Sequence, residues 1–298
     1  MMQAQMRKKR KSDEKVFDAV VNGLAFLIVV VVLYPLLFIV SASFSDPALV
    51  LNGEVILLPK QITLEAYQNV FQNEQIWNGY ANTILYTAVG TIINLIMTTL
   101  AAYPLSRPDL PGRGIIMVFI TLTMFFSGGL IPSYLLVKNL GMVDTMWALV
   151  IPGAIATYNL IVMRTYFQSN IPWEIQEAAH MDGCSNWKLL THVILPLSKP
   201  IMAVMVLFYA VGHWNSFFNA LIYIRSKDLY PLQLVLREVL MVSQADVVDS
   251  SVGLESKILL AESIKYVVII ISSLPVLLMY PFVQKHFVKG VMIGSLKG

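Results

Sequence analysis

Residues 19–45 read AVVNGLAFLIVVVVLYPLLFIVSASFS, a run of 27 residues without a charged side chain. A helix needs about 20 apolar residues to cross a bilayer, and a helix is favoured there because lipid offers no partner to an open backbone. The basic residues that precede the run could begin a signal peptide, but the apolar region of a signal peptide has only about 7–15 residues. The run therefore predicts a retained first transmembrane helix.

Five more uncharged windows follow, at 75–106, 114–137, 145–163, 200–224 and 266–284. A buried helix of a soluble protein would carry charges on its outer face, and these windows carry none. Of the 298 residues, 57% are hydrophobic and 13% are charged, whereas soluble domains have about 25% charged residues. The sequence therefore predicts an all-α membrane protein with six transmembrane helices, at about 20–44, 80–104, 114–137, 145–165, 200–223 and 265–285.

The distribution of Lys and Arg predicts the orientation of these helices. With six spans both ends lie on one side, and if that side is the cytoplasm, 14 of the 21 basic residues are cytoplasmic, as the positive-inside rule requires. We therefore expect a basic cytoplasmic N-terminus (1–18), a six-span domain (19–285) and a cytoplasmic tail (286–298) in the cytoplasmic (inner) membrane of a bacterium. Loop 167–199 is then cytoplasmic, and loop 223–264 lies outside.

The cytoplasmic loop reads IPWEIQEAAHMDGCSN at residues 171–186. Pro172 suits the first turn of a helix, Glu174 lies where the helix dipole favours an acid, and Gly183 is a natural helix stop. A second short helix follows, and Pro196 should end it. The pattern predicts two short helices joined by a glycine turn, a unit that can move as a rigid body.

The same loop contains Glu177-Ala178-Ala179-x-x-Asp182-Gly183 and then Ile194-Leu195-Pro196-Leu197, which resemble the EAA loop of the membrane subunits of bacterial ABC importers. The resemblance implies a coupling helix that inserts into a cleft of an ATPase subunit. Cys184 stands where alanine is usual and Leu190 where phenylalanine is usual, which bears on docking affinity. The residues implied in coupling are Glu174, Glu177, Ala178, Ala179, Asp182, Gly183, Cys184, Leu190 and Pro196. The alternative is an ordinary amphipathic loop resting on lipid headgroups.

Other parts of the chain extend the resemblance. The C-terminal run is similar to that of the smaller permease of maltose-type importers, which implies a tail that reaches the ATPases through Lys289, Gly290, Gly294 and Lys297. Residues 214–221 are similar to the same carbohydrate-uptake family, and residues 127–132 look like a subgroup of Gram-positive permeases for complex oligosaccharides. The implied partners are a second homologous permease, two ATPase subunits that hold ATP and Mg²⁺, and an extracytoplasmic sugar-binding protein that contacts the outer loop. The resemblance implies no cofactor in this chain.

The uncharged windows also bear on the source of energy, because proton-coupled transporters usually keep an ionisable residue in the membrane. His213 is the only candidate, so an external energy source such as a partner ATPase is favoured. In the fifth span, polar residues from Tyr209 to Asn219 fall within about 160° of a helical wheel. They could hold helices together or bind the hydroxyl groups of a sugar, and both interpretations stay open. The candidate substrate path is Tyr209, His213, Trp214, Asn215, Ser216 and Asn219, with Tyr158 and Asn159 of the fourth span.

Enzyme motifs are missing from these 298 residues. No G-x-x-x-x-G-K-[ST] and no H-E-x-x-H occurs, so no catalytic or metal-binding residue is expected. An intramembrane serine protease would rest on Ser127 and His213, but the G-x-S flank is absent. We expect the permease subunit of an ATP-driven, binding-protein-dependent importer for an oligosaccharide, which works by alternating access. The alternative is a self-sufficient channel or secondary carrier for a polar solute.

Overall fold

The computed structural model describes residues 2–249, 259, 264–279 and 281. In this part of the chain every regular element is a helix, as the sequence predicts. The chain divides into two compact units. The first comprises Met1–Gln72 and Leu240–Ile271, and the second comprises Asn73–Val239 and Ser272–Gly298.

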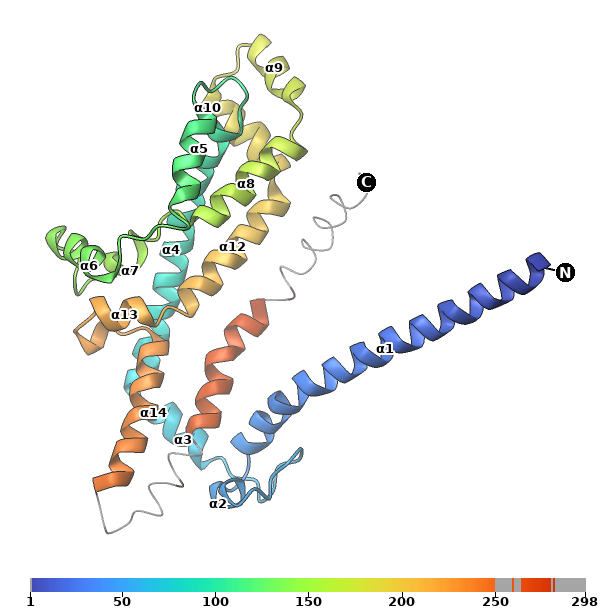
Figure 1. Ribbon diagram of the computed structural model, residues 1–298. Helices are drawn as coiled ribbons and strands as arrows, with labels where there is room; N and C mark the ends of the chain where they lie inside the picture. Colours follow the sequence, from blue (N-terminus) through green and yellow to red (C-terminus); the bar gives the residue numbers. More distant parts are fainter. Residues whose placement is uncertain (1, 250–258, 260–263, 280, 282–298) are drawn as a thin grey trace. The chain divides into compact units, whose positions relative to one another are not determined.

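The first unit contains the long helix α1, Met2–Ser43 (Figure 1). Its stretch Lys15–Ser43 is long and apolar enough to cross a membrane, and its apolar side chains are exposed along most of its length. Near the end of α1, Ser41 Oγ donates to the Leu57 carbonyl at 2.6 Å, which ties the helix to the segment that follows. Two short helices come next in the chain, α2 (Pro47–Leu51) and α3 (Glu65–Gln72).

The second unit is built around α4, Glu74–Ser106, which is also long and apolar enough to cross a membrane. Its buried face is rich in small and uncharged polar residues, among them Gly79, Thr83, Gly90, Thr91, Asn94, Thr98, Thr99 and Ala102. Small side chains let helix backbones approach closely in a membrane. Two helices, α8 (Thr157–Asn170) and α12 (Lys199–Trp214), pack against α4 (Figure 1).

Three of the predicted spans are interrupted. Their residues form the pairs α5 (Arg113–Leu122) and α6 (Leu130–Asn139), α7 (Trp147–Val150) and α8, and α12 and α13 (Phe218–Tyr223). Glycine accounts for the first break, since Gly129 has a φ of +87°. Proline contributes to the second, because Pro152 cannot continue the preceding helix.

Continuous helices long and apolar enough to span a membrane thus number two in the described part of the chain. A third results if the bent pair Asn186–Leu197 and Lys199–Trp214 is counted as one span. The last predicted span, 265–285, coincides with the helix Ile264–Met279 within the described residues. Interrupted helices can cross a bilayer where the broken backbone is buried in protein or lines a cavity, so the count of six spans stays a prediction.

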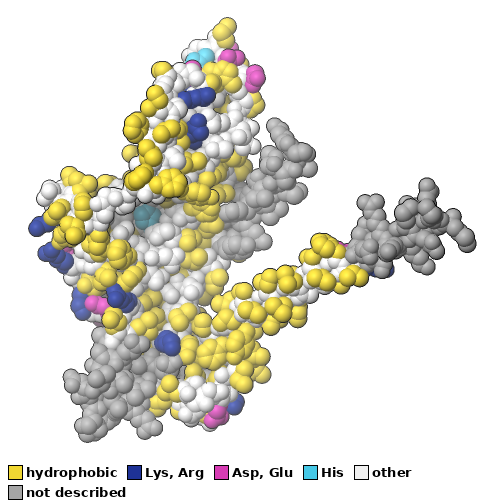
Figure 2. All heavy atoms as spheres, viewed as in Figure 1, with side chains coloured by type: hydrophobic (Ala, Val, Ile, Leu, Met, Phe, Trp, Pro, Cys, Tyr) yellow, Lys and Arg dark blue, Asp and Glu magenta, His cyan; other side chains and the backbone are white. Residues whose placement is uncertain are grey.

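Charged side chains gather in two regions of the second unit (Figure 2). One region comprises α9 (Trp173–Met181) and the turn between α4 and α5, and the other lies around α6 and α13. Between them the surface is largely apolar; α5 has no buried residue and exposes Ile115 and Phe119. An apolar belt between charged ends fits a bilayer, or a membrane-embedded partner, around the middle of this unit.

An apolar core lies at the α9 end of the second unit. It contains Met163 and Phe167 of α8, Leu189 and Ile194 from the segment that follows α9, and Met205 of α12, none more than 2% exposed. This core packs α8, α12 and the intervening segment together, so it positions the predicted coupling residues relative to the bundle.

Gly90 offers a test of the close packing between α4 and α12. A Cβ atom at this position would lie 2.6 Å from Cε1 and 2.8 Å from Cδ2 of His213. We expect Gly90→Ala to destabilise the protein by about 1–3 kcal/mol, the usual cost of overpacking. The measurement is the thermal unfolding of the purified protein in detergent.

Gly212→Ala is the matched control, because nothing lies within 4 Å of a Cβ atom at this α12 position. Its melting temperature should stay close to that of the wild type. Equal melting temperatures for Gly90→Ala and Gly212→Ala would contradict the packing described here.

Candidate functional site

The predicted coupling loop folds as a chain of short helices, and we call residues 171–198 the coupling segment. It consists of α9, α10 (Asn186–Leu189), a π-helical turn (Leu190–Ile194) and α11 (Leu195–Leu197). Gly183 separates α9 from α10 with a φ of +75°, a conformation that favours glycine. The chain therefore makes the glycine turn that the sequence predicts.

The residues implied in coupling are distributed over two sides of this segment. Leu190 is buried in the apolar core, and Ala179 and Cys184 are half-buried. The exposed ones are Glu174, Glu177, Ala178, Asp182, Gly183 and Pro196. Large apolar side chains are exposed beside them: Ile175 is 39%, Trp187 65% and Met181 89% exposed. The outer side of α9 and α10 thus carries both acids and uncovered apolar groups.

The second helix ends at Leu197, one residue after Pro196 and so close to the predicted end. The chain then turns by 84° into α12. A proline ring inside a helix clashes with the carbonyl four residues earlier, and the π-helical turn over Leu190–Ile194 changes the backbone spacing just before Pro196. The bend falls at Ser198, which is fully buried.

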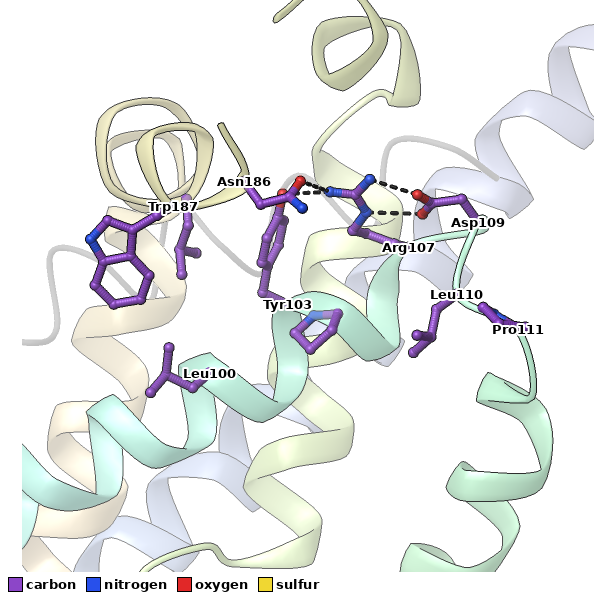
Figure 3. Close-up of a pocket in the computed structure, with 10 residues that line it drawn as sticks. Leu100, Tyr103, Arg107, Asp109, Leu110, Pro111, Asn186 and Trp187 are labelled. Carbon is purple, nitrogen blue, oxygen red and sulfur yellow. Dashed lines mark hydrogen bonds and ion pairs between the residues drawn. The ribbon is translucent and has the colours of Figure 1, made fainter. Parts of the chain in front are cut away.

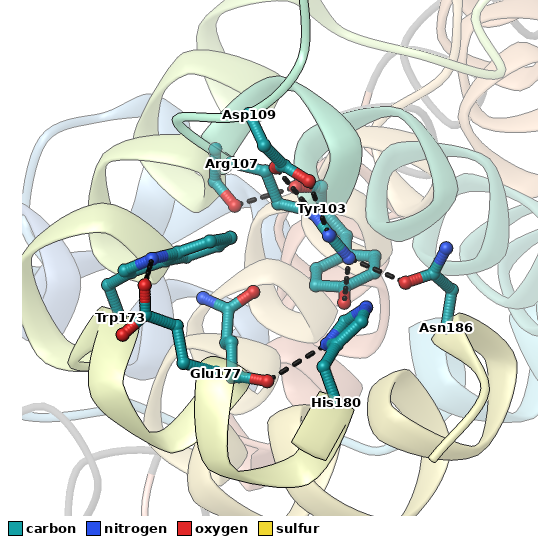
Figure 4. A network of polar contacts seen from close by, with 9 residues as sticks. Tyr103, Arg107, Asp109, Trp173, Glu177, His180 and Asn186 are labelled. Atoms are coloured by element: carbon teal, nitrogen blue, oxygen red, sulfur yellow. Dashed lines mark hydrogen bonds and ion pairs between the residues drawn. The ribbon is translucent and has the colours of Figure 1, made fainter. Parts of the chain in front are cut away.

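Arg107, the residue after α4, joins α4 to both short helices of the coupling segment (Figure 4). Its Nε and Nη2 donate to the two carboxylate oxygens of Asp109 at 2.9 and 2.6 Å, and its Nη1 donates to Asn186 Oδ1 at 2.6 Å and to the Tyr103 hydroxyl at 3.2 Å. The guanidinium carbon also lies 5.6 Å from the ring centroid of Trp173, within cation–π range. The ion pair with Asp109 is therefore one part of a larger network.

Both members of this ion pair are held in their charged forms. The hydrogen bond to Asp109 raises the pKa of Arg107, and the hydrogen bond from Arg107 lowers the pKa of Asp109. The network borders a cavity of about 390 Å³ that Leu100, Tyr103, Asn186 and Trp187 help to line (Figure 3).

Asn94 forms a polar centre in the middle of α4. Its side chain is fully buried, and its Nδ2 donates to the carbonyls of Gly153 and Ala154 at 2.7 and 2.9 Å. Both carbonyls belong to the break between α7 and α8. His213 Nε2 of α12 lies 2.6 Å from Asn94 Oδ1 and donates a hydrogen bond to it. One carboxamide thus joins α4, α12 and the interrupted fourth span.

Tyr209 repeats this pattern one helical turn away on α12. Its hydroxyl lies 2.6 Å from Thr98 Oγ1 of α4 and accepts from the backbone N–H of Ala156 at 3.3 Å. Trp214 is 6% exposed, and its Nε1 donates to the Ser272 carbonyl at 2.9 Å. Three residues of the candidate substrate path, Tyr209, His213 and Trp214, therefore bond to other segments of the protein. This geometry favours an interhelical role for them.

The remaining polar residues of the fifth span do not share that face. The helix ends at Trp214. The prediction that the polar residues from Tyr209 to Asn219 share one face of a single helix is therefore wrong beyond Trp214. Asn215 donates from Nδ2 to the Val211 carbonyl at 2.9 Å, which closes the helix end. Asn215 and Asn219 are exposed, and Ser216 is half-buried.

The fourth span contributes one exposed and one buried residue to the predicted path. Tyr158 is 59% exposed, whereas Asn159 is 8% exposed. Thr157 Oγ1 lies 3.0 Å from Thr123 Oγ1, which brings the start of α8 to the break after α5. The breaks of two interrupted spans therefore lie next to each other, and the exposed Tyr158 lies beside them.

At the other end of this unit, Asp144 holds the start of the predicted outer loop. Its carboxylate accepts from the backbone N–H groups of Arg225 and Ser226 at 2.8 Å and from the Ser226 hydroxyl at 2.6 Å. These bonds lower the pKa of Asp144, and the bond from the Ser226 hydroxyl has the largest effect. The predicted tail residues, Lys289, Gly290, Gly294 and Lys297, lie outside the described residues.

The sequence reasoning missed Asn94, Arg107 and Asp144. Asn94 could have been found, since a polar side chain inside an uncharged span usually bonds to a neighbouring helix. The short run Arg107-Pro108-Asp109 was a signal for a local ion pair, but nothing in it pointed to Asn186, 79 positions later.

The class of protein follows from this arrangement and from its relatives: the chain is a membrane permease subunit. Residues 92–293 match the binding-protein-dependent transport system inner membrane component family, and the chain belongs to this family. It is therefore a transport subunit of a binding-protein-dependent importer, and no known enzyme activity attaches to the family.

Individual relatives cover nearly the whole chain. It is 38% identical to the polygalacturonan/rhamnogalacturonan transport system permease protein YtcP of Bacillus subtilis (strain 168), over 95% of this chain and 99% of that protein. It is 41% identical to protein LplC of the same organism, over 95% of this chain and 96% of that protein. A chain of a bacterial ABC transporter involved in the import of the acidic polysaccharide alginate superposes with a TM-score of 0.83 at 34% identity, over 92% of this chain and 98% of that chain.

The hydrogen bond between Asn94 and His213 can be used to test whether the polar residues of the fifth span hold helices together. We expect Asn94→Ala and His213→Ala each to lower the melting temperature, and the double variant to lose less than the sum. The coupling energy should be about 0.6–1.7 kcal/mol, as for hydrogen bonds between other membrane helices. The measurement is a double-mutant cycle on thermal unfolding in detergent.

Asn215→Ala is the control for this cycle, because its side chain is exposed and bonds within its own helix. It should leave the melting temperature nearly unchanged. Strictly additive losses for Asn94→Ala and His213→Ala would show that the two side chains do not stabilise each other.

Proposed function

We propose that this chain is one of two homologous permeases in a complex with two ATPase subunits and an extracytoplasmic binding protein. The complex imports an oligosaccharide that contains uronic acids. The chain crosses the membrane six times with both ends in the cytoplasm, and ATP and Mg²⁺ bind only to the ATPases. The observation that carries this proposal is the coupling segment, a two-helix unit with uncovered apolar side chains at a charged end of an apolar bundle.

The outer side of the coupling segment suits a protein partner. Ile175, Met181 and Trp187 are exposed next to the carboxylates of Glu174 and Glu177. Exposed apolar groups with polar neighbours are typical of protein–protein contact sites. The resemblance to the EAA loop supports an ATPase as that partner, with closure of the ATPases moving the coupling segment and switching access.

The interrupted spans support a path for a polar solute. In a membrane, broken helices occur where the backbone lines a cavity or is buried in protein. Tyr158, Asn215 and Asn219 are exposed beside the breaks and can offer hydroxyl, amide and aromatic groups to a sugar. The partner permease would supply the other wall.

Charge supports an acidic sugar as the substrate. The relative YtcP is named for polygalacturonan and rhamnogalacturonan transport, and the structural neighbour for import of alginate, an acidic polysaccharide. The uncharged windows of this chain contain no Asp or Glu, so no carboxylate in them would repel an anionic sugar.

The substrate class can be tested by transport assays. The complex, reconstituted in proteoliposomes with its binding protein, should take up oligogalacturonates only when ATP is present. Uptake should exceed that of neutral arabino-oligosaccharides by about tenfold, a difference of about 1.4 kcal/mol. Equal or faster uptake of the neutral sugars would contradict the acidic substrate, and uptake by this chain alone would contradict the whole proposal.

Gly183 tests the role of the coupling segment. Valine in a left-handed conformation is strained by about 1–3 kcal/mol, so Gly183→Val should misplace α9 against α10. We expect ATP-driven uptake to fall at least about tenfold, while membrane insertion, measured by fractionation, is unchanged.

Gly141→Val is the matched control. Gly141 has a φ of +68°, Gly183 has a φ of +75°, and a Cβ atom at either position has nothing within 4 Å. Its backbone strain is similar, but it lies in the turn after α6, outside the coupling segment. Full uptake by Gly183→Val, or an equal loss in both variants, would contradict the coupling role.

A further inference from the structure

The guanidinium of Arg107 has little freedom left for a ligand. Arginine has five N–H donors, and four of them are used by Asp109, Asn186 and the Tyr103 hydroxyl. The side chain is 11% exposed, and its plane is flanked by aromatic rings. Arg107 therefore acts on the protein itself and does not form an anion site.

The partners of Arg107 belong to elements that are otherwise separate. Asn186 is the first residue of α10, and Trp173 is the first residue of α9. Trp173 continues the network, because its Nε1 donates to Glu177 Oε1 at 2.6 Å. A single side chain at the end of α4 thus contacts the first residues of α9 and α10 (Figure 4).

Among the described residues, apolar packing also joins α4 to the coupling segment. Tyr103 and Leu105 pack in the same core as Leu189 and Leu190. Apolar packing is not directional, whereas a bidentate arginine–carboxylate pair with further hydrogen bonds fixes orientation. Arg107 therefore supplies directional contacts from the end of α4 to α9 and α10.

Helix α4 leads from this network to the polar centre of the bundle. The same helix carries Asn94 and Thr98, which bond to His213 and Tyr209 of α12. If the coupling segment moves and displaces Arg107, the force acts on the end of α4, the helix that carries Asn94 and Thr98.

We propose that Arg107 is the positioning residue that ties both helices of the coupling segment to α4, so that displacement of the segment by the ATPase moves α4 and, with it, the bonds at the helix breaks. This inference rests on the coupling role of the segment proposed above. Without Arg107 the segment can still dock, but its movement is transmitted less completely to the membrane part.

The test uses the assembled complex in proteoliposomes, with the binding protein loaded from a mixture of pectin- and alginate-derived oligosaccharides. The readout is the ratio of ATP hydrolysis with and without the loaded binding protein, measured per assembled complex. We expect Arg107→Gln to lower this ratio about tenfold. Arg107→Lys, which keeps the charge but not the fork of donors, should give an intermediate ratio.

Arg113→Gln is the matched control. It removes the same charge at the start of α5, where Arg113 forms no hydrogen bond or ion pair among the described residues and its charge faces that of Arg164. Its ratio should equal that of the wild type. If Arg107→Gln fails to assemble, Asn186→Ala decides, because it removes one exposed acceptor and should lower the ratio in the same direction.

A wild-type ratio in Arg107→Gln, or in Asn186→Ala when it must decide, would overturn the inference. A loss of stimulated and unstimulated hydrolysis in equal proportion would also overturn it, since a purely structural role predicts that result. The proposed function fails separately, if the wild-type complex shows no stimulation or if Gly183→Val keeps full uptake.

Discussion

The hydrogen bonds of Asn94 are the interaction on which the rest of the bundle depends. The break between α7 and α8 leaves carbonyls without helical partners, and such groups are costly in a membrane. Asn94 satisfies the carbonyls of Gly153 and Ala154 and accepts from His213 in addition. One carboxamide therefore satisfies the break and ties it to α4 and α12, and Gly90 leaves the room that the His213 ring occupies against α4.

The two polar networks of the second unit are joined by one helix. Asn94 and Arg107 lie 13 positions apart along α4 and its end, which is about 20 Å at the helical rise. One network holds the interrupted spans together, and the other holds the coupling segment. Since the second unit is largely apolar between its charged ends, these bonds supply the directional contacts that apolar packing lacks. The uncovered groups on α9 and α10 are then available to a partner.

Much of this could be predicted from the sequence, because composition determines it. Runs without charge predicted the apolar helices, and Gly183 predicted the turn between α9 and α10. The uncharged runs alone do not show the helix breaks, but Gly128-Gly129 and Pro132 indicated the irregularity between α5 and α6, and the breaks after α7 and α12 were not predicted. The hydrogen bond from Arg107 to Asn186 joins residues of two distant segments, so it depends on the tertiary fold. The π-helical turn before Pro196 could not be predicted either, because it is not apparent from residue type.

The bend at Ser198 places the coupling segment almost at a right angle to α12. The arm from Asn186 to Leu197 meets α12 at 84°, and α12, with 16 residues, is about 24 Å long. A tilt of α12 of about 10° around the bend would carry Trp214 through about 4 Å, a distance that follows from the same helical rise. Small rotations at the surface are thereby converted into displacements at the helix breaks of the size of a water molecule or a hydroxyl group.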